Sequence, residues 1–116
     1  MSAAVTDMRD FILALERETP RSLHPITDEA LCWWFGELRD AVDNPAAVLV
    51  LTRKICARVV QELEFEAENA ESAGFHHTAY RARRQAERFA VRLPDVASTL
   101  LSISSARRLA FWGRGN

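Results

Sequence analysis

The sequence predicts an all-α protein, and three observations lead to this fold class. Apolar residues recur at three- and four-residue steps along most of the 116 residues. Proline or glycine separates the successive apolar stretches. The alternating glutamates of residues 62–68 resemble a strand pattern, but they lie inside an unbroken helical repeat. We therefore expect one domain over residues 1–116, a compact bundle of about five helices with one long central helix.

The first helix is predicted over residues 2–18. An apolar stripe at helical spacing would face the core, and it consists of Val5, Met8, Phe11, Ile12 and Leu15. Thr19 precedes Pro20, and the residue before a proline is disfavoured in the helical conformation. The helix should therefore end at about Glu18, with a stiff connector at residues 20–26.

The second helix is predicted over residues 28–43, with Thr27 as its N-cap. Ile26 and Leu31 occupy the two positions of a hydrophobic staple. The inward-facing residues of this helix are Leu31, Trp34, Phe35, Leu38 and Val42. Trp33 falls off this stripe, among Glu29, Glu37 and Asp40, so it should point to a polar face.

The central helix is predicted over residues 44–74, with Asn44 as N-cap, Pro45 in the first turn and Gly74 as the C-terminal stop. Its apolar stripe consists of Val48, Leu51, Ile55, Val59, Leu63, Ala67 and Ala70. Phe65 lies outside this stripe, among polar and charged neighbours.

The last two helices are predicted over residues 78–93 and 95–111, with a break at Leu93-Pro94. A stripe of mostly small residues on the first of them would permit close packing, namely Ala79, Ala82, Ala86, Phe89, Ala90 and Leu93. The inner face of the last helix would be Val96, Leu100, Ile103 and Ala110.

The composition argues against several classes of function. The net charge of -1 does not favour a surface that generally seeks nucleic acid or membrane. The N-terminus lacks the pattern of a secretion signal, and no stretch approaches the ~20 apolar residues of a membrane span, so we expect a cytoplasmic protein. Cys32 and Cys56 should then be reduced thiols that pack as small hydrophobic residues.

The sequence carries no recognisable catalytic motif. It has no glycine-rich phosphate loop, nucleophile elbow or zinc-hydrolase pattern. The adjacent His76 and His77 do not form the i, i+4 pair that a helix presents to one metal ion. We therefore expect a protein that is not an enzyme, and we assign no catalytic residue, metal ligand or cofactor.

Four arginines at helical spacing offer a basic surface: Arg81, Arg84, Arg88 and Arg92. They could bind nucleic acid, or they could pair within the chain. Folding back about Gly74 would bring Glu68 near Arg81, Glu64 near Arg84 and Glu62 near Arg88. The sequence favours this internal pairing. The C-terminal residues 107–114, rich in arginine and aromatic residues, could likewise stack on bases or pack into the bundle, and packing is favoured.

The aromatic residues on polar faces are the strongest indication of a partner. Trp33 and Phe65, with Leu13 as a lesser member and Glu37 beside Trp33, are the candidate partner-binding residues. Two alternatives stay open at this point. The two aromatic side chains could form an interface with another protein, or other helices of the bundle could cover them.

The opening Asp7–Leu13 and the Trp33-Trp34-Phe35 cluster, together with the chain length and helix order, resemble the QslA-like antiactivators of bacterial quorum sensing. That resemblance implies a homodimeric helical protein that occupies the dimerisation surface of a LuxR-type transcriptional regulator, which then fails to dimerise and to bind DNA. Small helical phage proteins that inhibit host defence complexes look similar. Our leading hypothesis is an inhibitor that acts by protein–protein contact; the alternatives are nucleic-acid binding through the four arginines and a purely structural subunit.

Overall fold

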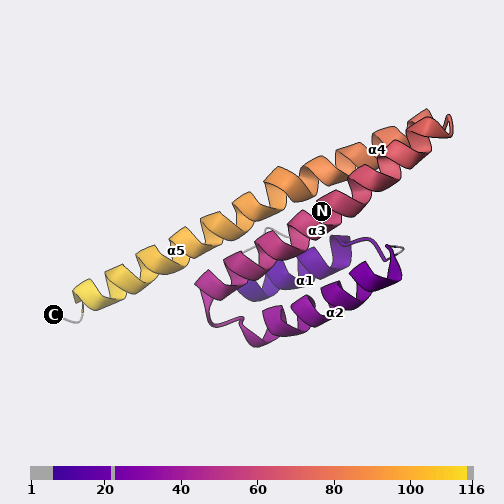
Figure 1. Cartoon of the computed structure of the whole chain (residues 1–116). Helices are drawn as coiled ribbons and strands as arrows, with labels where there is room; N and C mark the ends of the chain where they lie inside the picture. The colour runs from indigo at the N-terminus through magenta and orange to yellow at the C-terminus, as the bar shows by residue number, and fades with distance from the viewer. Residues whose placement is uncertain (1–6, 22, 115–116) are drawn as a thin grey trace.

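The structure is a computed structural model that describes residues 7–21 and 23–114, with side chains up to residue 103. It confirms an all-α protein, and the described residues contain no strand. The helices are α1 (Met8–Glu18), α2 (Pro25–Asp40), α3 (Pro45–Ser72), α4 (His76–Glu87), the π-helical segment η1 (Arg88–Arg92) and α5 (Leu93–Arg114). Since α4, η1 and α5 follow one another without a break, the described residues form four helical rods (Figure 1).

The four rods form two layers. One layer is α1 and α2, and the other is α3 and the continuous α4–η1–α5 rod (Figure 1). The bundle is elongated, with extents of 65 × 26 × 22 Å. In Figure 1 the α3–α4 hairpin projects beyond α1 and α2 at one end, and α5 projects at the other. The long helix predicted at the centre is α3, and the α4–η1–α5 rod is a second long element beside it.

The apolar stripe of α3 supplies the centre of the core, as predicted. The first six of its seven members are buried, and only Ala70 is partly exposed. Large side chains from the other helices complete the core, among them Phe11, Leu15, Phe35, Leu38 and Phe89. Each fully buried large apolar side chain stabilises the fold by about 1.5–3 kcal/mol relative to exposure, so this shared core holds the two layers together.

The ends of α3 are also as predicted. The Asn44 side chain accepts a hydrogen bond from the Ala47 backbone N–H (3.3 Å), which satisfies a donor that the first turn leaves free. Gly74 has a φ of +85°, a left-handed conformation that side chains disfavour. This residue lets the chain turn back from α3 into α4.

The start of α2 differs from the prediction. The helix begins at Pro25, and its N-cap is His24, whose Nδ1 accepts from the Ile26 N–H (3.3 Å). A proline in the first turn needs no hydrogen-bond donor, so the helix can begin three residues earlier than expected. Thr27 is therefore inside the helix and fully buried, and the staple assigned to Ile26 is wrong because this side chain is 65% exposed.

The predicted break at Leu93-Pro94 is also wrong. The Leu93 N–H donates to the carbonyl of Arg88, five residues back, in the π-helical pattern. Pro94 has no N–H to donate, and the wider π turn just before it lets the rod continue. Ala90 and Ile103, both expected inside, are exposed, whereas Leu93 and Leu100 are buried as predicted.

The predicted pairing of glutamates with arginines in the α3–α4 hairpin does not form. Within the described residues, Glu71 instead pairs across the hairpin with Arg83 (3.1 Å), and His76 Nδ1 lies 2.9 Å from the same carboxylate. Arg88 instead pairs with Glu18 of α1, and Glu62 with Arg58. Among the described residues, the predicted row of ion pairs is therefore absent from the hairpin.

Candidate protein-interaction surfaces

The outer face of α2 carries two large exposed apolar side chains. Trp33 is 69% exposed and Ile26 is 65% exposed. They are seven residues apart, two helical turns, and therefore lie on one face about 10 Å from each other. Glu29, Glu37 and Asp40 are exposed around them. We call these five residues the α2 surface: an apolar pair with an acidic border.

Trp33 is held in place on this surface. Its indole Nε1 donates a hydrogen bond to Oε1 of Glu37, one turn later, at 2.6 Å. A bond to a carboxylate is stronger than one between neutral groups. The ring is thereby restrained before any partner arrives, which lowers the entropy lost on binding.

The helix below this surface is firmly anchored. Leu31, Phe35 and Leu38 are buried on the opposite side of α2. Near its N-terminus, the Thr27 hydroxyl donates to Oε1 of Glu62 (2.6 Å) and accepts from Nε of Arg58 (3.1 Å). The α2 surface therefore lies on a helix that packs into the core on its opposite side and is hydrogen-bonded to α3 near its N-terminus.

Phe65 and Leu13 are exposed as well, by 63% and 51%, so the bundle does not cover them. They lie on α3 and α1, however, and not beside Trp33. The Thr27–Glu62 hydrogen bond places Phe65 past the start of α2, about 13 Å along the helix axes from Trp33. Leu13 lies on α1, the neighbour of α2 in the same layer. The four predicted partner-binding residues therefore do not form one patch.

Sequence reasoning missed Ile26, because it was assigned to the helix start. The available signal was its i, i+7 relation to Trp33. Two further exposed aromatic residues, Phe75 (63%) and Tyr80 (57%), lie at the α3–α4 hairpin and were also not assigned to a surface.

The four arginines of the predicted basic surface have different environments. Arg88 forms a two-pronged ion pair with Glu18, with Nε donating to Oε2 at 2.7 Å. This guanidinium lowers the pKa of the Glu18 carboxyl, and the carboxylate in turn raises the pKa of Arg88. Arg84 lies over the Tyr80 ring, 5.9 Å from its centroid. Arg81 and Arg92 are exposed and make no ion pair with a described residue.

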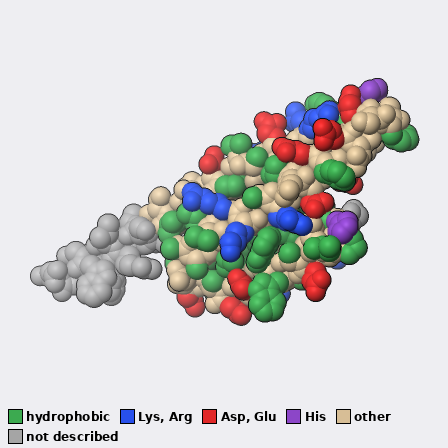
Figure 2. Space-filling view, viewed as in Figure 1, with side chains coloured by type: hydrophobic (Ala, Val, Ile, Leu, Met, Phe, Trp, Pro, Cys, Tyr) green, Lys and Arg blue, Asp and Glu red, His purple; other side chains and the backbone are tan. Residues whose placement is uncertain are grey.

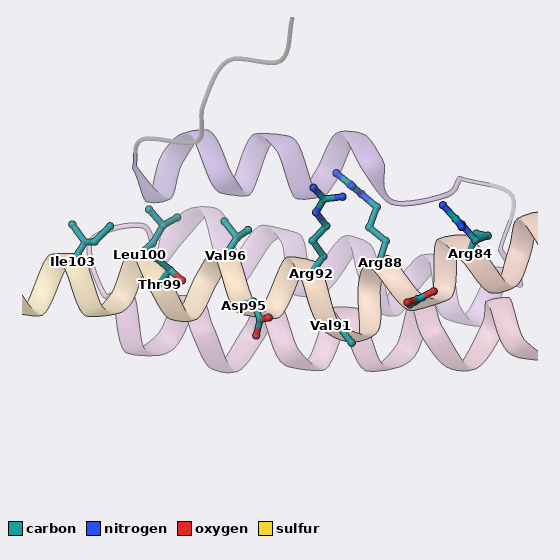
Figure 3. Close-up of a pocket in the computed structure, with 10 residues that line it drawn as sticks. Arg84, Arg88, Val91, Arg92, Asp95, Val96, Thr99, Leu100 and Ile103 are labelled. Carbon is teal, nitrogen blue, oxygen red and sulfur yellow. The ribbon is translucent and has the colours of Figure 1, made fainter.

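Three of these arginines line a shallow groove of about 700 Å³ along the rod (Figure 3). In Figure 3, Arg84, Arg88 and Arg92 point to the same side, in line with Val96, Leu100 and Ile103. Glu87 and Asp95 also line the groove. The face drawn in Figure 2 likewise mixes acidic, basic and hydrophobic side chains. This groove therefore mixes both signs of charge and is not a uniformly basic track of the kind that follows a phosphate backbone.

No group of three or more His, Cys, Asp or Glu residues in the described part of the chain could hold a metal ion. None of the helices, as far as they are described, is long and apolar enough to cross a membrane. Searches for relatives found no matching family model, no matching curated protein and no matching solved structure.

Proposed function

We propose that this protein is a non-enzymatic regulator that works in the cytoplasm by binding another protein through its α2 surface. The observation that carries the proposal is Trp33, which is exposed yet fixed by Glu37. Tryptophan is the residue most enriched among binding hot spots, and an aromatic side chain can bury roughly 150–250 Å². An exposed, restrained tryptophan on a rigid helix is suited to fill a groove on a partner.

The partner that we propose is a LuxR-type transcriptional regulator, and the sequence resemblance supports this choice. In this mechanism Trp33 and Ile26 occupy apolar positions of the regulator's dimerisation surface, and the acidic border contacts basic groups around it. The bound regulator cannot dimerise and so loses its DNA. Inhibition requires only that the affinity and concentration of the inhibitor exceed those of self-association.

The test compares Trp33→Ala with the wild-type chain in binding to a purified LuxR-type regulator from the same bacterium. Isothermal titration calorimetry should show binding weakened by about 30-fold or more, which corresponds to ~2 kcal/mol for a hot spot. Phe75→Ala is the matched control, since Phe75 is a similarly exposed aromatic at the far hairpin. A folded Trp33→Ala protein with wild-type affinity would remove Trp33 from the interface.

A second function, nucleic-acid binding, is favoured by Arg81 and Arg92, which are exposed and form no ion pair with a described residue. It predicts that the protein alone retards DNA or RNA in a gel, with a steep loss at higher salt. The proposed inhibitor should instead release the regulator from its promoter without shifting the DNA itself. Absence of a shift at low salt eliminates the nucleic-acid alternative.

A further inference from the structure

A second shallow groove, of about 460 Å³, lies on the α3–rod layer. All of its lining residues come from α3, η1 and α5, and none comes from α1 or α2. From the rod it takes Phe89, Ala90 and Pro94. The α3 side consists of Arg53, Cys56, Ala57, Val60, Gln61 and Glu64. This surface is separate from the α2 surface, which belongs to the other layer.

The α3 lining has a symmetric spacing. Its positions are 53, 56, 57, 60, 61 and 64, which read the same in both directions about the point between residues 58 and 59. One end is a cation, Arg53, and the other end is an anion, Glu64. A symmetric row with opposite charges at its ends is complementary to a copy of itself laid antiparallel, which is the arrangement that a two-fold axis generates.

Neither end charge has an ion-pair partner in the part of the chain that the structure describes. Arg53 and Glu64 are exposed, and neither forms an ion pair with a described residue. Eleven residues of helix separate their backbones by about 16 Å, too far for them to pair with each other. In the antiparallel arrangement, each Arg53 would face the Glu64 of the other copy, so one contact would form twice.

The centre of the row permits close approach. Ala57 is exposed and Val60 is half-buried, and the groove continues over Ala90 and Pro94 of the rod. Small side chains at a helix crossing let the two backbones approach each other. The opposite charges of Arg53 and Glu64 at the ends of the row would set the register between the two α3 helices. We propose that a second copy of this chain docks here, with α3 packed antiparallel on α3 and crossing at Ala57 and Val60. The proposal does not depend on the inhibitor function.

Sedimentation velocity over a range of concentrations tests the association, and charge reversal tests the surface. Arg53→Glu and Glu64→Arg should each weaken the dimer by about tenfold or more, because each places two pairs of like charges in contact. Lys54→Glu and Glu68→Arg are matched controls, since they make the same charge changes at exposed α3 positions outside the lining. The controls should leave the dissociation constant within about threefold of the wild type.

Mixing supplies the decisive measurement. In an equimolar mixture of the Arg53→Glu and Glu64→Arg proteins, every reversed position meets an opposite charge, so a dimer of the two variants should form with an affinity near that of the wild type. Ala57→Arg, at an exposed helix position, should prevent dimerisation in a chain whose circular dichroism is unchanged. A wild-type chain that stays monomeric at all concentrations, or a dimer that survives the single reversals, would overturn the proposal.

Discussion

Two buried threonines should respond differently to the same substitution. Thr27 on α2 and Thr52 on α3 are both fully buried. The Thr27 hydroxyl bonds to Glu62 and Arg58. The Thr52 hydroxyl is the one buried side-chain polar atom, among those described, that lacks a hydrogen-bond partner. Valine has nearly the shape of threonine without the hydroxyl, so Thr→Val at each site isolates the hydroxyl.

The magnitudes follow from these environments. A hydrogen bond to a charged group contributes about 1.5–3 kcal/mol, but Glu62 and Arg58 can regain water when the hydroxyl is removed, since their side chains are 21% and 36% exposed. Thr27→Val should therefore lower the free energy of unfolding by ~1–2 kcal/mol. An unsatisfied buried hydroxyl is itself costly, so Thr52→Val should leave stability unchanged or raise it by about 1 kcal/mol.

Urea unfolding of both variants, followed by far-UV circular dichroism, measures the difference. We expect the two to differ by ~1–3 kcal/mol, out of a total stability of roughly 6–17 kcal/mol for a chain of this size. Helix propensity hardly distinguishes valine from threonine, so it cancels between the sites. Equal effects at the two sites, or a larger loss at Thr52, would refute this account of the two hydroxyls.

Two further predictions concern titratable groups. Arg88 lowers the pKa of Glu18, so the ion pair's contribution is present above the ordinary glutamate pKa and is lost as the pH falls through the folded-state value. With both side chains at least a third exposed, Glu18→Gln should cost no more than ~1 kcal/mol at neutral pH and nothing in acid; denaturant unfolding at both pH values checks this. For the thiols, burial raises the pKa of Cys56 to about 12, whereas Cys32 is exposed. A thiol reagent at mildly alkaline pH should label Cys32 in the native protein and Cys56 only after unfolding, and native labelling of Cys56 would contradict its burial.

A helix could be predicted from the sequence where its apolar repeat and its capping residues indicated the same bounds. Along α3, the apolar repeat, Asn44 and Gly74 each indicated the same helix, and the structure has it there. The helix break predicted at Leu93-Pro94 was wrong because it relied on the rule that proline ends a helix. A proline normally ends a helix, but a π-helical segment that ends two residues before Pro94 accommodates it. Phe89 within this segment and Leu93 just after it are buried in the core, and the local sequence does not reveal that packing.

The surface was harder to predict because it depends on the relative register of the helices. The polar neighbours of Trp33 correctly indicated that it is exposed, since those neighbours lie on its own helix. The pairing of Glu62 with Arg88 required the register between two helices, and a small shift gives each residue a different partner. Arg88 instead donates a hydrogen bond to Glu18, seventy residues away in the sequence. Cys32 was expected to pack as a small hydrophobic residue, and it is exposed because it lies outside the buried face of α2 formed by Leu31, Phe35 and Leu38.

The two proposed surfaces are compatible because they belong to different layers of the bundle. A two-fold dimer formed through α3 would bury the outer side of the α3–rod layer and leave both copies of the α2 surface open. Such a dimer would present two Trp33 side chains, one on each outer layer. If the partner normally dimerises through the surface that Trp33 occupies, one inhibitor dimer would hold two partner molecules with its own width between them. Dimerisation of the inhibitor would then reinforce the separation of the partner subunits, because both binding events oppose their contact.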